Sequence, residues 1–272
     1  LIPFVYVFLG LPVIVKNVTG TAGTLGMSYA EKAKPDGYTI AGVVLPDVVL
    51  AQELQGTATH VQDFKPIYGW FKGPMAVEVR SESPYETFDE LIEAAKEKKL
   101  RAAIVGIGTI DHLHDCLIEK FTNTEFIKVP YGGGGPATRA ALSGEADFLV
   151  GVTTTGLRFV RDGRLRMLTI LGPERVDEVP DVPTIHELGY EDYPYIPFVR
   201  GAMAPPGVPE DRMAKLEEAF KKAVDEEGFR KVMKKQGRPV KEFSRAEMKE
   251  VVKDNFRLAK EYMPLMKEDQ KK

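Results

Sequence analysis

The residues best suited to chemistry lie together between Asp111 and Cys116, in the stretch DHLHDC. If this stretch is helical, His112 and Cys116 are four residues apart and share one face, which is typical of a metal-ligand pair or of a base beside a thiol. No third ligand follows at a conventional spacing, and Asp115 falls on a different face. Cys116 also lies in the body of the predicted helix, where apolar neighbours raise the pKa of a thiol. We therefore interpret His112 as a polar residue that stabilises the helix start, and we predict no catalytic residue, no metal site and no cofactor.

An alternative of a different class stays open at this stage. His112, together with Asp111 or Cys116, could act as base or nucleophile in an enzyme for a small carboxylate or phosphate substrate. Replacing His112 by Asn separates the two hypotheses, because a binding protein keeps its ligand whereas an enzyme loses turnover.

The helix that carries these residues follows a glycine-containing turn. Leu100–Val105 is an apolar run of strand length, and Gly106–Thr109 leads from it into a helix predicted over Asp111–Phe121. Thr109 is placed as the N-cap, with Asp111 in the first helical turn. A helix start presents unpaired N–H groups and a partial positive charge, which suits a carboxylate or a phosphate. The glycine spacing does not match the dinucleotide fingerprint, and glycines that merely close a tight turn fit the pattern equally well.

Two further side chains are candidates for ligand contact. Tyr131 precedes the run Gly132–Gly135, where the backbone can approach a ligand closely, although a core tyrosine fits this position equally well. Arg200 interrupts an apolar extended stretch and could bind a second carboxylate in a bidentate manner. A surface ion pair is the alternative for Arg200; we prefer the ligand contact, because the flanking Phe198 and Val199 would bring this residue to the mouth of a cleft.

Composition and charge exclude several classes of protein. The chain has 272 residues, a formal net charge of -3 and the single cysteine Cys116, which argues against nucleic acid as a partner and excludes an internal disulfide. No apolar run is long enough to cross a bilayer. Leu1–Val15 is apolar but lacks a basic region at its start and is interrupted by Pro3, Gly10 and Pro12. We do not interpret it as a signal peptide, and the compartment stays open.

Short strand patterns alternate with helical patterns as far as Val152, which indicates an α/β protein with mostly parallel sheets. Thr87 and Glu90 fit a capping box that starts a helix at Phe88. From Pro205 onward the pattern is helical. The predicted strands are Leu11–Lys16, Tyr38–Leu45, Phe64–Tyr68, Pro74–Arg80, Leu100–Val105, Phe126–Val129, Asp147–Val152 and Leu165–Leu171.

In parallel sheets, ligands bind beyond the carboxyl ends of the strands. Four predicted loops meet this description, and they are rich in glycine, threonine or accessible backbone rather than in catalytic side chains. This pattern favours binding over turnover. The loops are Thr19–Gly26, Leu45–Asp47, Gly106–Asp111 and Thr153–Gly156.

Several blocks of the sequence together resemble the tricarboxylate-type solute receptors of tripartite transporters, the Bug or TctC-like extracytoplasmic binding proteins. The blocks occur in the family's order and cover nearly the whole chain. They are PVIVKNVTGTAGTLG (12–26), KPDGYT (34–39), GIGTIDHL (106–113), VPYGGGGPA (129–137), GRLRML (163–168), DVPTIHELG (181–189) and APPGVP (204–209).

The resemblance implies a two-domain periplasmic-binding-protein fold of the Venus-flytrap type II class, with the ligand in the cleft. It implies a monomeric, extracytoplasmic receptor, periplasmic or lipid-anchored, that passes a small organic carboxylate to a membrane permease. It also implies two segments that cross between the domains, which we place near 74–80 and 197–204. The expected domains are therefore 1–76 with 202–272, and 77–201.

In such receptors backbone amides at helix starts hold the carboxylate. Carried onto this sequence, the amides are those of Ile107, Gly108 and Thr109, with Leu45 and Pro46 opposite and Thr153–Thr155 on the far side. With the candidates above, the predicted ligand-binding residues are Leu45, Pro46, Ile107, Gly108, Thr109, Tyr131, Thr153, Thr154, Phe198 and Arg200.

Two features depart from the family pattern. The family has a Gly-Gly…Asp loop after its first strand, whereas here Leu1–Phe4, which resembles the end of that strand, passes almost directly to LGLPVIV. We expect that about a helix's length of sequence lies outside the given chain; a differently built clamp is the alternative. Asp111 is the second departure, because a carboxylate beside an anion site opposes binding unless it points outward.

Overall fold

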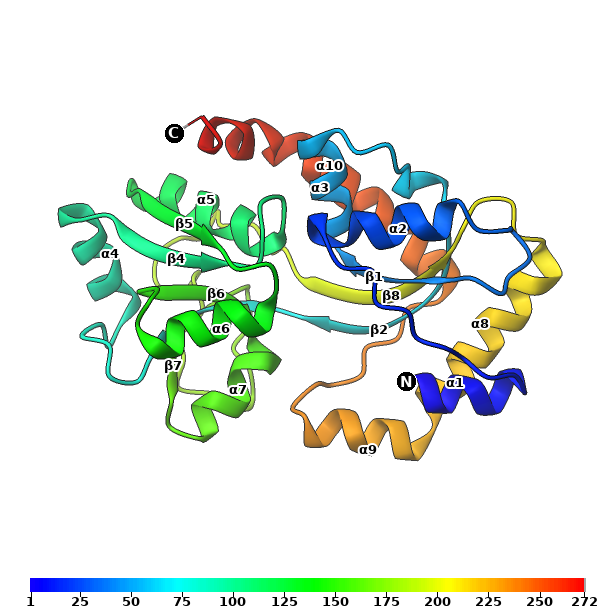
Figure 1. Cartoon of the computed structure of the whole chain (residues 1–272). Helices are drawn as coiled ribbons and strands as arrows, with labels where there is room; N and C mark the ends of the chain where they lie inside the picture. The colour runs from blue at the N-terminus through cyan, green and yellow to red at the C-terminus, as the bar shows by residue number, and fades with distance from the viewer. Residues whose placement is uncertain (272) are drawn as a thin grey trace. The chain divides into compact units, whose positions relative to one another are not determined.

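The computed structural model describes residues 1–271, and its chain divides into two compact units (Figure 1). Unit 1 comprises Leu1–Lys72 and Val199–Pro264, and unit 2 comprises Gly73–Phe198 and Leu265–Lys272. The chain therefore passes from one unit to the other after Lys72, after Phe198 and after Pro264. The expected bounds at 76 and 201 lie slightly later in the chain, and the residues after Pro264, which we expected in the first domain, group with unit 2.

The sheet of unit 2 has five strands in the order β5-β4-β6-β3-β7. Strand β4 is parallel to β5 and β6, whereas β3 is antiparallel to both β6 and β7, so pairing is mixed where mostly parallel strands were predicted. The strands are β3 (Met75–Arg80), β4 (Leu100–Ile104), β5 (Phe126–Pro130), β6 (Phe148–Val152) and β7 (Leu165–Leu171).

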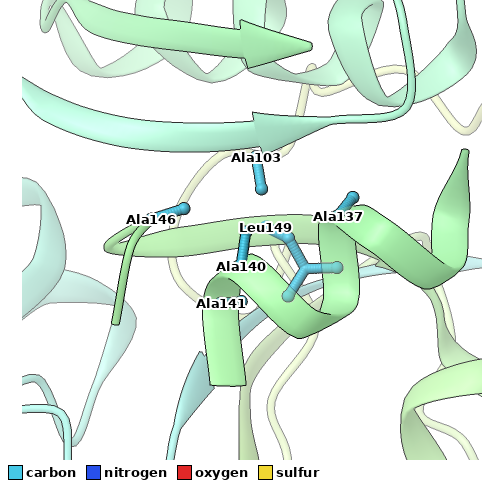
Figure 2. Packing of buried hydrophobic residues seen from close by; sticks show 6 residues of the cluster. All are labelled: Ala103, Ala137, Ala140, Ala141, Ala146 and Leu149. Atoms are coloured by element: carbon cyan, nitrogen blue, oxygen red, sulfur yellow. The ribbon is translucent and has the colours of Figure 1, made fainter. Parts of the chain in front are cut away.

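Helices α5, α6 and α7 pack against the strands of this sheet (Figure 1). Helix α6 packs on β4 and β6 through a cluster of alanines, because small side chains allow a helix to lie close to a sheet (Figure 2). Helix α4 begins with the predicted capping box of Thr87 and Glu90, which is confirmed. The helices are α4 (Phe88–Glu97), α5 (Ile110–Thr122), α6 (Gly134–Ser143) and α7 (Thr153–Arg161).

The sheet of unit 1 has three strands in the order β1-β8-β2. Strand β1 is antiparallel to β8, with Val44 opposite Arg200 and Leu45 opposite Val199. The strands are β1 (Ala41–Leu45), β2 (Lys65–Gly73) and β8 (Phe198–Ala204). The helices are α1 (Ile2–Leu9), α2 (Thr24–Glu31), α3 (Asp47–Gln55), α8 (Glu210–Asp225), α9 (Glu227–Lys235) and α10 (Arg245–Asp269), with single 3-10 turns at Thr21–Gly23 and Val61–Asp63.

Two predictions for the start of the chain are wrong. Leu1–Phe4 is not the end of a strand, because α1 occupies Ile2–Leu9. Leu11–Lys16 is not a strand either; Ile14 is 88% exposed and Val15 is 60% exposed. β-branched residues favour a strand only when a neighbouring strand supplies packing and backbone hydrogen bonds.

Helix α10 continues through Pro264 to Asp269. Among the described helices, none combines the length and the apolar character needed to span a membrane.

Candidate functional site

The predicted anion loop, Gly106–Thr109, connects β4 to α5 and is held by three internal hydrogen bonds. The Thr109 hydroxyl donates to the Gly106 carbonyl, and the Val105 amide donates to the Asp111 carboxylate. The Gly108 amide donates to Nδ1 of His112 at 3.2 Å. Gly108 has φ +86°, a left-handed conformation that glycine adopts without steric cost. The loop is therefore fixed in shape at the N-terminus of α5.

These bonds change the roles predicted for two residues. Thr109 occupies the N-cap position as predicted, but its hydroxyl makes no capping bond to the helix. It donates instead to the Gly106 carbonyl within the loop. The Gly108 amide is engaged by His112, so we remove it from the predicted set of anion donors. The amides of Ile107 and Thr109 stay predicted donors.

Asp111 does not point outward. Its side chain is buried, and its carboxylate accepts the Val105 amide beneath the loop. Burial raises the pKa of Asp111, while the neighbouring Thr109 hydroxyl and the hydrogen bond from the Val105 amide act in the opposite direction. A carboxyl group that is hydrogen-bonded inward opposes an anion less than one exposed beside it.

A third ligand-type residue lies beside His112 and Cys116, contrary to the expectation from spacing. The ligand atoms of His112, Cys116 and Asp269 lie within 4.8 Å of one another. Asp269 comes from the end of α10, and its Oδ2 is 3.0 Å from Nε2 of His112. No local spacing in the sequence indicates this partner, because it is 157 positions away.

The protonation of His112 argues against a metal ion here. Nδ1 accepts the Gly108 amide and therefore carries no proton, so the single proton of the neutral ring is on Nε2 and is donated to Asp269. A metal on Nε2 would leave both ring nitrogens without a proton while Nδ1 still accepts a hydrogen bond. His112 and Asp269 therefore fit a hydrogen-bonded pair better than a metal site.

Lys128 of β5 completes this network. Its ammonium group lies 2.6 Å from Oδ1 of Asp269 and 2.8 Å from the carboxylate of Glu119. Although burial alone would raise the pKa of Asp269, hydrogen bonds from His112 and Lys128 lower it to about 2. These contacts hold the end of α10 at Asp269 to α5 and β5, which is the physical reason why this end groups with unit 2.

The structure gives no support to an active site built on Asp111, His112 and Cys116. All three side chains are at most 2% exposed. Burial raises the pKa of the Cys116 thiol, which keeps it in its weakly nucleophilic form. The interpretation of His112 as a residue that stabilises the helix start agrees with its bond to Gly108.

Two more predicted ligand residues of unit 2 are engaged within the protein. The Tyr131 ring packs against the alanine cluster, and its hydroxyl donates to Glu145 at 3.1 Å, which favours the structural alternative. Both the amide and the hydroxyl of Thr153 donate to the Pro74 carbonyl. Thr153 and Thr154 begin α7 rather than a loop, and both side chains are buried.

The remaining predicted residues are distributed over β1, α3 and β8. Leu45 and Phe198 are buried, and the Pro46 carbonyl accepts the amides of Val49 and Leu50 at the start of α3. Arg200 is half-buried on β8. Burial lowers its pKa, as does Arg238, while Asp47 opposes the shift. The predicted ligand contacts of these residues stay predictions.

Comparison with solved structures defines the class of protein. The periplasmic binding protein BugD has 25% sequence identity and a TM-score of 0.89, over 97% of this chain and 90% of BugD. MatC of Rhodopseudomonas palustris, solved with bound malate, has 24% identity and a TM-score of 0.89, over 96% of this chain and 91% of MatC. The protein therefore has the two-domain fold of periplasmic solute-binding proteins.

Sequence comparison defines the family. The family model for the tripartite tricarboxylate transporter family receptor matches residues 6–267, and the chain belongs to this family. A protein of Cupriavidus necator encoded in the gbd 5' region is 32% identical over 84% of this chain and 69% of its own length. A protein of Pseudomonas sp. strain P51 from the tcbD-tcbE intergenic region is 29% identical over 79% of this chain and 65% of its own length. The chain thus spans about two thirds of these relatives.

Proposed function

We propose that the protein is an extracytoplasmic receptor that binds a small di- or tricarboxylate, or a related acid, without converting it. It would deliver this ligand to the membrane permease of a tripartite transporter and act as a monomer, in the periplasm or anchored by a lipid to the outer face of the cytoplasmic membrane. Family membership supports the receptor role, and malate in the related MatC suggests the first ligand to test.

The observation that carries the proposal is the fixed loop at the start of α5. Three internal hydrogen bonds hold Gly106–Thr109 at the positive end of a 13-residue helix. A loop that is already ordered loses little conformational freedom when an anion binds, which favours affinity. We assign the anion contact to the Thr109 amide, and the contact of Ile107 stays the prediction that the family resemblance implies.

Calorimetric titration of the full chain with malate, adipate and citrate tests the proposal, with phosphate as the inorganic control. The replacement T109P removes the Thr109 amide, and the matched control T109A keeps the amide while losing the hydroxyl. We expect T109P to weaken carboxylate binding by tenfold or more, equivalent to about 1.4 kcal/mol, and T109A to weaken it less.

Equal affinities of T109P and T109A would overturn the assignment of this amide. Recovery of chemically changed ligand would contradict a receptor without turnover, and H112N would then identify the active site. No binding of any carboxylate by the wild-type chain would reject the ligand class.

A further inference from the structure

Three groups form a continuous hydrogen-bonded chain from the C-terminal helix to the anion loop. The Asp269 carboxylate accepts the Nε2 proton of His112 at 3.0 Å, and Nδ1 of the same ring accepts the Gly108 amide at 3.2 Å. His112 is fully buried, and Gly108 is buried, so water does not replace either bond readily. In Figure 1 the red C-terminal turn of α10 lies above α5, in keeping with this connection.

We propose that Asp269 is a positioning residue for the anion loop and acts through His112. The proposal rests on the proposed function, because it takes Gly106–Thr109 as the carboxylate-binding loop. Asp269 makes no direct contact with the loop in this assignment. Its effect is to fix the ring of His112, which in turn fixes the peptide plane before Gly108.

The direction of each hydrogen bond explains why an acceptor is needed at position 269. The neutral imidazole has one proton, and only the Nε2–H form leaves Nδ1 free to accept the Gly108 amide. The carboxylate of Asp269 favours that form, because it accepts a proton and cannot donate one. Without this acceptor, the Nδ1–H form and rotated ring positions become accessible, and both break the bond to Gly108.

Lys128 explains why the carboxylate stays in place. Its ammonium group binds Oδ1 of Asp269, while Oδ2 faces His112, so the two oxygens have separate partners. Glu119 binds the other side of Lys128 at 2.8 Å. Asp269 is therefore oriented by a partly buried ion pair with Lys128, although it lies near the end of the chain.

Amide hydrogen exchange and ligand titration of the full chain test the proposal. In D269A we expect the Gly108 amide to exchange about tenfold faster, while the Leu117 amide in the body of α5 changes little. We expect malate or adipate, whichever the wild-type chain binds, to bind roughly fivefold to tenfold more weakly, the effect of one lost hydrogen bond. The 15N signals of the His112 ring should show loss of the pure Nε2–H form.

Matched variants separate positioning from a general loss of stability. D269E restores a carboxylate and should recover part of the affinity and of the Gly108 protection. D254N makes an Asp-to-Asn change on the exposed face of the same helix and should alter neither. If D269A does not fold, D269L carries the same test, because Leu has a similar size and removes the acceptor for His112.

Unchanged Gly108 exchange and unchanged affinity in the Asp269 variants would overturn the proposal. If the wild-type chain binds no carboxylate, the proposed function fails, but Gly108 exchange and the His112 ring signals still decide whether Asp269 positions the loop.

Discussion

We predict that the buried side chain of Glu78 makes the stability of the protein depend on pH in an unusual way. Glu78 lies within β3 and is 1% exposed. Its Oε1 has no hydrogen-bond partner among the described residues. Its carboxyl group occupies the space left by the missing side chains of Gly151 and Gly156. Burial raises the pKa of Glu78 from 4.5 to about 8.

The sign of the effect follows from proton binding. Between pH 4.5 and about 8 the folded protein keeps a proton on Glu78 that the unfolded chain has lost. The free energy of unfolding therefore falls as the pH rises through this window, by about 1.4 kcal/mol per pH unit, or about 5 kcal/mol in all. Below pH 4.5 this group makes no pH-dependent contribution.

The replacement E78Q isolates the contribution of this carboxyl group, because Gln has a similar shape and does not titrate. We monitor urea unfolding of the wild-type chain and of E78Q through hydrogen exchange of the β3 amides. At pH 4.5 the two proteins should have similar free energies of unfolding. At pH 8 we expect E78Q to be more stable by several kcal/mol. The control is E82Q, which changes an exposed glutamate a few residues further along the chain. Trp70 fluorescence reports the unfolding of unit 1 separately.

Parallel pH profiles for the wild-type chain and E78Q would refute this reasoning. They would mean that water or a local rearrangement solvates Glu78 in the folded protein, so that burial no longer determines its pKa. Lower stability of E78Q at pH 8 would refute it as well.

Two further predictions concern stability. T87A removes the hydroxyl that accepts the Glu90 amide at the start of α4. We expect T87A to lower the free energy of unfolding by about 1 kcal/mol in urea, and T87S to lower it less. An unchanged urea midpoint for T87A would contradict the capping role. K128M leaves the carboxylates of Glu119 and Asp269 without their shared cation. We expect the free energy of unfolding to fall by about 3 to 5 kcal/mol in thermal or urea unfolding. A fall below about 1 kcal/mol would show that water solvates these ion pairs in the folded protein.

Local signals predicted the parts of the fold that local interactions determine. The strand Leu165–Leu171 has the predicted bounds, and the capping box at Thr87 is present because both of its bonds join residues within one helical turn. Leu11–Lys16 has an equally strong strand pattern but forms no strand. Its β-branched residues find no neighbouring strand, and sequence pattern alone does not show whether one is present.

The candidate site was predictable in its position but not in its internal bonding. Gly106–Thr109 lies at the helix start where the sequence placed it, since a strand, a glycine turn and a capping residue are consecutive signals. The engagement of Gly108 by His112 depends on which ring nitrogen carries the proton. That choice depends on Asp269, which is distant in the sequence and reaches α5 only in the folded chain.

The polar face of α5 shows how the same residues supported several hypotheses before the fold was known. His112, Cys116 and Glu119 recur at the spacing of a buried helix face, yet two of them are polar, and this combination suggests a metal or catalytic site. In the folded chain the cation of Lys128 and the carboxylate of Asp269 provide the partners that make most of this polarity tolerable. The polar side chains of α5 therefore hold the Gly106–Thr109 loop and the end of α10 in place through His112, Lys128 and Asp269.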